Sequence, residues 1–304
     1  MSPGARVAVA GRELSLSNLD KVLYPKTGTT KGEVIDYYRR VAPALLPHLQ
    51  GRALTLKRYP NGVEGQFFYE KRCPSHRPEW VRVAPLGGDR RGSPIPYCVV
   101  DDLPTLVWVA NLASLELHTS LAKAEATQSP TVVVFDLDPG EPATVVECAR
   151  VALEIREVLD GLGLSSCAKS SGSKGMQLYA PLNTPATYDA TKGFALAVAR
   201  LMEKRRPKEV VSEMRKELRR GKVFIDWSQN DEHKTTVSVY SLRAMPTPTV
   251  SCPLMWDEVT QVAGGDASPA RQELGAVIER VEGQGDLFAP VVELRQKLPD
   301  LAAS

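Results

Sequence analysis

Two aspartates at the end of an apolar run are the residues of this chain best suited to chemistry. Residues 132–135 are β-branched or aromatic, which is typical of a buried strand, and Pro139-Gly140 ends the run. Because alternate side chains of a strand share a face, Asp136 and Asp138 project together, roughly 7 Å apart at the Cα. Crowded carboxylates repel each other, and a divalent cation such as Mg²⁺ or Mn²⁺ relieves that repulsion. The alternative for a bare Asp-x-Asp is that one Asp caps the turn and the other is solvated.

A third aspartate and a loop of small residues extend this set. Asp226 ends a second apolar, β-rich run, residues 223–225, so it is also expected at a strand end. In residues 169–175 (KSSGSKG), small side chains let backbone N–H groups converge on an anion, and Lys174 adds a positive charge. The Gly-x4-Gly-Lys spacing of a Walker loop is missing. Three carboxylates with such a loop fit metal-dependent phosphoryl transfer.

A second anion site is expected near the N-terminus. Thr30 and Glu33 form a capping box that opens a helix. Lys31 stands at the first helical position, where its charge opposes the helix dipole unless an anion binds there. Lys21 lies close enough in sequence to join such a site. The alternative is a Lys31 side chain that extends to solvent.

Aromatic and basic residues are interleaved in two expected strands, residues 54–58 and 66–71. Rings alternating with Lys57 and Arg58 suit single-stranded nucleic acid, because rings stack on bases and cations pair with phosphates. The alternative is that these aromatic residues form a second buried layer of the core. Three consecutive aromatics over 67–69 cannot all face one core, however, so at least one is expected to be exposed.

The remaining patterns predict a chain that mixes strands and helices. Residues 145–162 repeat apolar side chains at three- and four-residue steps, which predicts an amphipathic helix, and a strand near 164–169 completes a βαβ-like unit. Other expected elements are a frayed leader over 1–10, strands over 13–16, 115–118 and 235–242, the helix from Thr30 limited by Pro43 and Pro47, helices over 103–114 and 188–205, and one or two acidic helices over 265–304.

Composition indicates an ordinary globular chain. It has 304 residues, 43% hydrophobic and 24% charged, and contains neither an apolar run of membrane-spanning length nor a signal peptide's pattern at its start. Five scattered cysteines suggest reduced thiols in a cytoplasm.

The net charge of +2 is unevenly distributed. Residues 200–222 hold ten basic and four acidic residues (10 − 4 = +6), and residues 52–91 hold nine and four (9 − 4 = +5). Two basic segments suit a polyanion, and a solvated helix surface is the alternative.

These motifs together resemble the polymerase domain of bacterial ligase D, a member of the archaeo-eukaryotic primase superfamily. The resemblance runs from about residue 13 to 260. It is carried, in order, by residues 18–25 (NLDKVLYP), 57–62 (KRYPNG), 135–139 (FDLDP), 171–175 (SGSKG), 223–230 (VFIDWSQN) and 240–243 (YSLR).

The resemblance implies roles for individual residues. Asp136, Asp138 and Asp226 are expected to bind two catalytic divalent metal ions, Mn²⁺ or Mg²⁺. Contacts with the incoming nucleoside triphosphate, NTP or dNTP, are implied for Lys57, His118, Ser171, Ser173, Lys174, Gln177 and Arg243. Asn18, Lys21 and Lys31 are expected to bind the 5′-phosphate at a DNA break. Phe68 and Tyr69 are expected to stack on the template. Other DNA contacts are implied for Arg58, Arg219, Arg220, Lys222 and Gln229.

The implied fold is α+β: a primase-type catalytic core with a modified RNA-recognition-like (RRM-like) antiparallel or mixed sheet and helices on its outer faces. It is expected as one domain over residues 10–304, with a DNA-contacting part over 12–130, a catalytic core over 131–260 and a helical tail over 265–304.

The implied activity is template-directed addition of nucleotides, with ribonucleotides preferred, during double-strand break repair by end joining. Gapped or broken DNA, Ku and an ATP-dependent DNA ligase are the implied partners. The expected location is cytoplasmic and nucleoid-associated, without a membrane, as a monomer or a DNA-mediated dimer.

Two features depart from the family pattern. The family has His after the phosphate loop, where this chain has Gln177, which hydrogen-bonds but carries no charge. The chain also has no Lys-x-Asp-Gly ligase motif, which fits either a stand-alone polymerase or a piece of a longer protein.

Two other functions remain open from the sequence. One is a catalytically weak module that bridges 5′-phosphorylated DNA ends; the three aspartates argue against it, because acids disfavour phosphate in a purely binding site. The other is a metal-dependent nuclease, against which the basic cradle argues.

Overall fold

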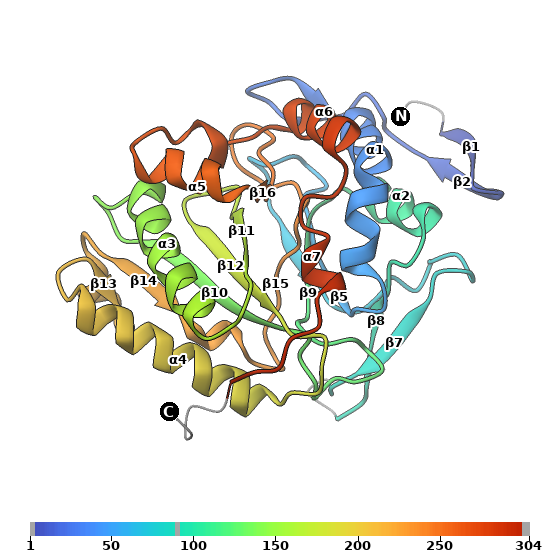
Figure 1. The fold of residues 1–304 in the computed structure, drawn as a ribbon. Helices are drawn as coiled ribbons and strands as arrows, with labels where there is room; N and C mark the ends of the chain where they lie inside the picture. Colours follow the sequence, from blue (N-terminus) through green and yellow to red (C-terminus); the bar gives the residue numbers. More distant parts are fainter. Residues whose placement is uncertain (1–3, 89–91, 300–304) are drawn as a thin grey trace. The chain divides into compact units, whose positions relative to one another are not determined.

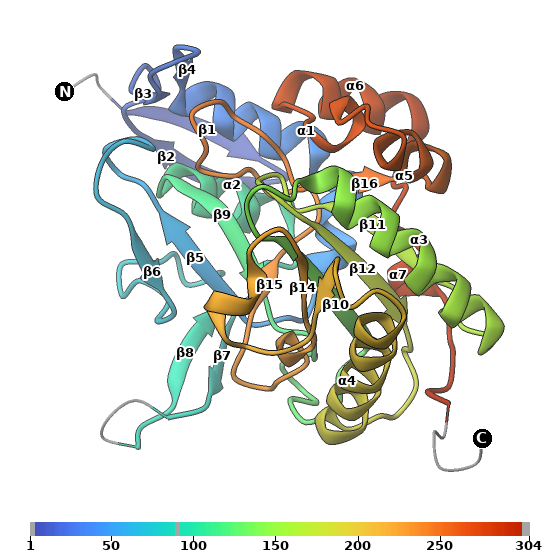
Figure 2. The same ribbon diagram turned by 90° about the vertical axis from the view of Figure 1, so that its left-hand side faces the viewer.

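The computed structural model describes residues 4–88 and 92–299, and the chain divides into two compact units. The first takes its described residues from Met1–Ser120, Val237–Val250 and Glu273–Asp286, and the second from Leu121–Thr236, Ser251–Gln272 and Leu287–Ser304. Figures 1 and 2 show their mixture of sheets and helices. This mixed α/β architecture confirms the predicted fold class.

The second unit is built on a six-stranded sheet. Its strand order is β13 (Val210–Val211), β14 (Val223–Asp226), β10 (Val132–Pro139), β12 (Met176–Pro181), β11 (Cys167–Ser170) and β16 (Pro253–Leu254). All neighbours are antiparallel except β13 and β14, which are parallel. The predicted helix α3 (Val145–Gly161) connects β10 to β11, and β12 lies between those two strands.

Alternation along β10 separates the core from the chemistry. Val133, Phe135 and Leu137 are fully buried in a cluster with apolar residues of α3 and of α4 (Tyr188–Arg205), so both helices cover that face of the sheet. Because strand side chains alternate, Asp136 and Asp138 point to the opposite face. The unit also contains two shorter α-helices, α5 (Trp256–Ala263) and α7 (Pro290–Glu293), and the 3₁₀ helices η1 (Lys216–Arg219), η2 (Trp227–Gln229) and η3 (Ser268–Ala270).

The first unit has its own sheet. The strand order is β15 (Thr236–Val237), β9 (Ser114–Thr119), β5 (Leu54–Arg58), β8 (Ile95–Cys98) and β7 (Val83–Leu86), and β6 (Phe68–Glu70) also pairs with β5. Helices α1 (Lys31–Leu49), α2 (Leu103–Asn111) and α6 (Leu274–Gln284) belong to this unit, together with the hairpins β1 (Ala5–Val9)–β2 (Arg12–Leu16) and β3 (Val22–Tyr24)–β4 (Thr29–Thr30).

Helix α1 begins as predicted and ends later than predicted. Thr30 accepts from the backbone N–H of Glu33 and the Glu33 carboxylate accepts in return, which is the expected capping box. The helix then continues through Pro43 and Pro47 to Leu49. Its buried apolar face outweighs the hydrogen bonds that the two prolines remove.

Two other predictions of local structure are wrong. Residues 5–9 are a paired strand and not a frayed leader, because Ala10 and Gly11 adopt positive φ values of 45° and 78° and close a tight hairpin to β2. The strand expected over 235–242 is reduced to Thr236–Val237, since Tyr240 has a φ of 61°, which is incompatible with extended backbone.

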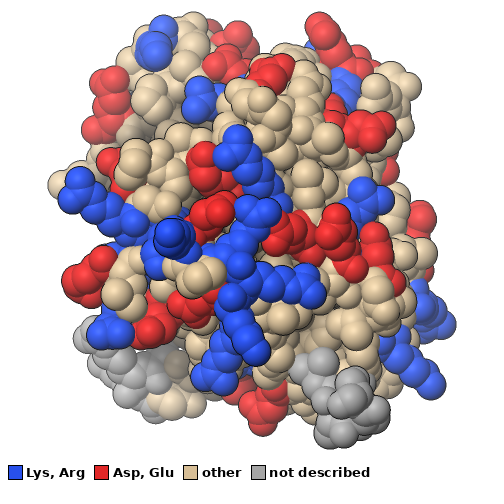
Figure 3. All heavy atoms as spheres, turned by 60° about the vertical axis from the view of Figure 1, so that its left-hand side comes forward, with Lys and Arg blue, Asp and Glu red and all other residues tan. Residues whose placement is uncertain are grey.

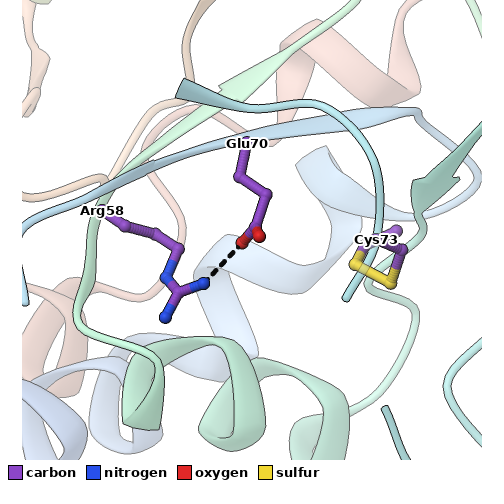
Figure 4. The surroundings of a disulfide bond; sticks show 4 residues. Arg58, Glu70 and Cys73 are labelled. Carbon is purple, nitrogen blue, oxygen red and sulfur yellow. Dashed lines mark hydrogen bonds and ion pairs between the residues drawn. A yellow bond between two sulfur atoms is a disulfide. The ribbon is translucent and has the colours of Figure 1, made fainter. Parts of the chain in front are cut away.

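A disulfide corrects the expectation that all cysteines are reduced thiols. Cys73, which follows β6, is bonded to Cys98 at the end of β8, and both are buried. Figure 4 shows the bond close to the ion pair between Arg58 of β5 and Glu70 of β6, whose atoms lie 2.7 Å apart. The aromatic strand β6 is therefore fastened at its far end as well as along β5.

Two glycines set close backbone approaches in the second unit. A Cβ at Gly175 would lie 2.1 Å from the carbonyl oxygen of Leu137, and one at Gly140 would lie 1.9 Å from that of Arg219. The loop over 171–175 and the basic segment near Arg219 can therefore reach β10 only because these positions have no side chain.

No helix in residues 4–88 or 92–299 combines the length and apolarity needed to cross a membrane.

The disulfide should contribute measurably to stability. Cys98→Ser should lower the free energy of unfolding by about 3 kcal/mol, because the bond closes a loop with a sequence separation of 25. Urea titration with and without reductant measures this, and Cys167→Ser, at a cysteine outside the disulfide, is the control. If reductant does not shift the wild-type curve, the bond is absent in solution.

The approach of Gly175 to β10 can be tested by adding one methyl group. Gly175→Ala should lower the free energy of unfolding by about 1–3 kcal/mol, because the new Cβ collides with backbone. Gly193→Ala in α4, where a Cβ meets nothing within 4 Å, should raise it by roughly 0.5–1 kcal/mol. Equal effects of the two variants would contradict the packing described here.

Candidate active site and nucleic-acid interface

The predicted aspartates meet on the face of the second unit's sheet that α3 and α4 do not cover. In the strand register, Asp136 lies opposite Asp226 of β14 on one side and opposite Gln177 of β12 on the other. Gln177 is in turn opposite Lys169 of β11. One row across four strands thus reads Asp226, Asp136, Gln177, Lys169, and Asp138 is two residues from Asp136 on the same face.

The carboxylates of this row differ in their surroundings. Asp226 accepts hydrogen bonds from the N–H and the hydroxyl of Ser228, at 3.0 and 2.5 Å. Asp136 accepts from Gln229 Nε2 at 3.3 Å. Asp138 is exposed. Gln229, predicted as a DNA contact, therefore also supports the carboxylate row.

Burial makes the charge on Asp136 costly. Burial and the negative charges of Asp138 and Asp226 together raise the pKa of this carboxyl to about 7, while the hydrogen bond from Gln177 and the charge of Lys169 act in the opposite direction. A divalent cation held by Asp136, Asp138 and Asp226 would offset this repulsion, and an all-oxygen donor set suits Mg²⁺ or Mn²⁺. The residues present therefore fit the expected ions.

In residues 4–88 and 92–299, no three His, Cys, Asp or Glu side chains are already gathered closely enough to form a metal-binding group. The fit consequently rests on strand register and charge, and an ion would have to draw the carboxylates together.

The predicted phosphate loop lies beside this row. Ser171 Oγ accepts from the N–H groups of Ser173 and Gly175, at 3.2 and 3.1 Å, which folds the loop into a compact turn. Gly175 packs on the carbonyl of Leu137, between the two aspartates of β10 in sequence. Lys174 is largely exposed and pairs with Glu141, itself exposed, at 3.0 Å. Such an exposed pair is weak and can be exchanged for an anionic ligand.

Gln177 is buried where the family has histidine. Its Nε2 donates to Thr236 Oγ1 at 3.1 Å, and the hydroxyl of Tyr179 lies 3.4 Å from its Oε1. Lys169, which the sequence analysis did not single out, is fully buried and donates to Ser251 Oγ at 2.6 Å. It places a positive charge in the same row as the carboxylates.

In the first unit, three predicted nucleotide ligands gather around one buried carboxylate. Lys57 Nζ, His118 Nε2 and Arg243 Nε lie 3.4, 2.9 and 3.5 Å from the carboxylate oxygens of Glu116. The sequence analysis missed Glu116, although the alternation with buried Leu115 and Leu117 places Glu116 and His118 on one face.

The aromatic residues on β6 do not share one face. Tyr69 lies opposite Lys57 in the register and its ring is 5.9 Å from that of His118. Phe68 lies opposite Arg58, whose guanidinium sits 5.1 Å from its ring. Both rings are exposed, and so is Phe67, which stacks on Tyr59 at 5.3 Å. Phe67 is a third candidate stacking residue, and the sequence analysis left it without a role.

The residues predicted for the 5′-phosphate line one pocket of about 530 Å³ in the first unit. Asn18, Lys21, Lys31 and Arg58 all contribute to it. Lys31 is buried and donates to the backbone oxygen of Ser17 at 2.7 Å, while the exposed Lys21 donates to Asn61 at 3.0 Å. Burial, with the charges of Lys21 and Arg58, lowers the pKa of Lys31 to about 8.

Some basic side chains of the segment over 200–222 are already paired with acidic residues. Arg206 pairs with Glu154 and Glu209, and Arg215 pairs with Glu213. Figure 3 shows Lys and Arg side chains crowding part of the surface with Asp and Glu among them. Of the predicted DNA contacts in this segment, Arg219 lies over the Phe224 ring at 3.6 Å, Lys222 donates to Pro207 O, and Arg220 is exposed.

The structure therefore gathers the predicted residues into three clusters. The second unit holds the carboxylate row with Gln177 and the Ser171–Lys174 loop. The first unit holds the cations around Glu116 with Tyr69, and separately the pocket of Asn18, Lys21 and Lys31. The roles assigned to these residues stay predictions.

Comparison with known proteins gives one consistent family. The model of the LigD primase-polymerase domain matches residues 30–288. The chain is 42% identical over 278 residues to the multifunctional non-homologous end joining protein LigD of Mycolicibacterium smegmatis, covering 91% of this chain and 36% of that protein. It is 33% identical over 277 residues to the bifunctional non-homologous end joining protein LigD of Bacillus subtilis, covering 91% of this chain and 44% of that protein.

A solved structure agrees. The polymerase domain of Mycobacterium tuberculosis ligase D in complex with DNA matches with a TM-score of 0.85 and 37% identity, over 93% of this chain and 99% of that one. The chain spans 36% and 44% of the length of these two curated LigD relatives but nearly all of that polymerase domain. From motifs, fold and these matches, the chain belongs to the LigD primase-polymerase domain family.

Proposed function

We propose that this protein is a template-directed nucleotidyltransferase that adds nucleotides, preferentially ribonucleotides, to DNA ends and gaps during double-strand break repair by end joining. The observation that carries this proposal is the row in which Asp136 stands opposite Asp226, beside a loop fastened to the same strand. Membership of the LigD primase-polymerase family supports it.

The proposed chemistry assigns separate tasks to the residues. Asp136, Asp138 and Asp226 would hold two divalent ions, Mn²⁺ or Mg²⁺, which when bound lower the pKa of a primer 3′-hydroxyl and neutralise phosphate charge. The N–H groups of the 171–175 loop and Lys174 would bind the triphosphate. Lys57 and Arg243 supply further positive charge for the nucleotide, with His118 beside them, and exposed Phe68 and Tyr69 supply stacking surfaces.

Partners follow from the same comparison. The related M. tuberculosis domain was solved with DNA, which supports DNA binding here. The names of the curated relatives refer to non-homologous end joining, and we propose that Ku and an ATP-dependent DNA ligase act with this protein and that it works on the bacterial nucleoid.

Primer extension on a gapped duplex tests the proposal, with Mn²⁺ compared to Mg²⁺ and ribonucleotides to deoxyribonucleotides. Templated lengthening with ribonucleotides in Mn²⁺ is the expected result. Shortening of the primer would indicate a nuclease. Tight binding without any change in length would favour the end-bridging module.

The carboxylate row gives a specific prediction for catalysis. Asp136→Asn should reduce the extension rate about 10³-fold or more, because metal-bound charge stabilises the transition state by several kcal/mol. Asp231→Asn is the control, since Asp231 pairs with Lys192. Isothermal titration with Mn²⁺ should show the same loss without any nucleotide. Full activity of Asp136→Asn would contradict the proposal that Asp136 binds the catalytic metal ions.

Phosphate recognition should depend on pH. Lys31, with a pKa near 8, is charged at pH 7 and mostly neutral at pH 9, whereas a 5′-phosphate stays doubly negative over this range. Preference for phosphorylated over unphosphorylated gapped duplex should therefore fall between pH 7 and pH 9 at constant ionic strength, as measured by fluorescence anisotropy.

Lys31→Ala provides the comparison for this experiment. It should show a weaker preference at pH 7 and little further change up to pH 9, because the titrating group is gone. A wild type that does not discriminate between the two ends at any pH would refute the phosphate pocket.

A further inference from the structure

Glu116 is the most buried member of a group of charged residues. Glu116 is only 2% exposed and lies in the middle of β9. Its Oε1 lies 3.4 Å from Lys57 Nζ and 3.5 Å from Arg243 Nε, and it accepts from the backbone N–H of Ala244 at 3.1 Å. Its Oε2 accepts from His118 at 2.9 Å. A single carboxylate thus contacts groups from three separate segments.

The strand register explains how these groups meet. Lys57 of β5 lies opposite Glu116 of β9 on one side and Tyr69 of β6 on the other. His118 is two residues along β9 and shares the same face. Arg243 comes from the irregular segment after β15, and the hydrogen bond from Ala244 to Glu116 fixes that segment.

The carboxylate also stabilises the aromatic surface. Lys57 Nζ lies 4.5 Å from the ring of Phe67 and 5.3 and 5.5 Å from those of Tyr59 and Tyr69. The ammonium group of Lys57 thus makes cation–π contacts with three rings, and these contacts depend on the position of the ammonium group. Glu116 is the carboxylate that pairs with this ammonium group.

Charge balance shows what removal of this carboxylate would do. Lys57 and Arg243 are largely buried, with side chains 14% and 19% exposed, and they repel each other. Glu116 offsets one positive charge and leaves the group with an excess of positive charge. Without it, the two cations would move apart toward water, and His118 would lose its hydrogen-bond acceptor.

We propose that Glu116 is a positioning residue that holds Lys57, His118 and Arg243 in the orientation in which they receive the anionic nucleotide. This inference rests on the proposed polymerase function, because that function gives these three side chains their ligand. Glu116 itself is too deeply buried to contact the nucleotide, so it acts through its partners.

The pKa of His118 gives a readout independent of catalysis. Burial lowers this pKa, Arg243 and Lys57 lower it further, and Glu116 raises it. The groups facing the ring are Glu116 on its own strand, Lys57 on β5, Tyr69 on β6 and Arg243. Removing the charge of Glu116 while keeping its shape should therefore shift the His118 pKa downward.

The experiment compares Glu116→Gln, Glu116→Asp and the control Glu282→Gln, which removes another arginine-paired carboxylate of the first unit. The chain has four histidines, so NMR of histidine-labelled protein can follow each imidazole, with His118→Gln assigning the signal. In Glu116→Gln the His118 pKa should fall, and KM for the nucleoside triphosphate should rise about tenfold with a smaller change in kcat. Glu116→Asp should recover part of both, and Glu282→Gln should match the wild type.

Each outcome decides one question. An unchanged His118 pKa together with an unchanged or lower KM in folded Glu116→Gln overturns the positioning role. A loss of kcat alone, with KM and the His118 pKa unchanged, also overturns it, because that pattern reflects general structural damage. A wild type that does not extend primers refutes the proposed function, while the His118 titration still reports whether Glu116 holds the group together.

Discussion

The central constraint on this molecule is electrostatic: like charges must be kept side by side on a sheet. Asp136 and Asp226 are register neighbours on adjacent strands, which no globular fold would favour for stability alone. The cost is limited by the hydrogen bonds from Ser228 to Asp226 and from Gln229 to Asp136, and by buried Lys169 at the end of the same row. The helices α3 and α4 seal the opposite face, so the strands cannot turn to relieve the repulsion.

In the first unit the charges are reversed. There, one buried carboxylate, Glu116, lies among Lys57, His118 and Arg243. Burial alone would raise the pKa of Glu116, but the hydrogen bond from His118 and the charges around it hold this pKa at about 2. Both units therefore place an excess of one charge on one sheet face with opposite charge beside it: Lys169 and Lys234 near the aspartates, and Glu116 near Lys57 and Arg243. Such arrangements are compatible with binding a polyanion together with its metal ions, because neither site is neutralised before its ligand arrives.

Much of this could be predicted from the sequence where the signal is local. The alternation around Asp136 and Asp138, the capping box of Thr30 and Glu33 and the periodicity of α3 each depend on a few neighbouring residues, and the structure has them as predicted. What failed depends on distant partners or on single backbone angles. Glu116 gains its role from Lys57 and Arg243 across strands, Cys73 could not be paired with Cys98 among five cysteines, and the positive φ of Tyr240 cut a strand that its composition favoured.

The contact between Gly175 and Leu137 has a consequence for motion. Because the Gly175 Cα lies against the backbone of β10 with no room for a methyl group, the loop is held at a fixed distance from the strand that carries Asp136 and Asp138. Loop and carboxylates must then move as one rigid piece. The exposed pair of Lys174 with Glu141, in contrast, can break without disturbing the backbone of the loop.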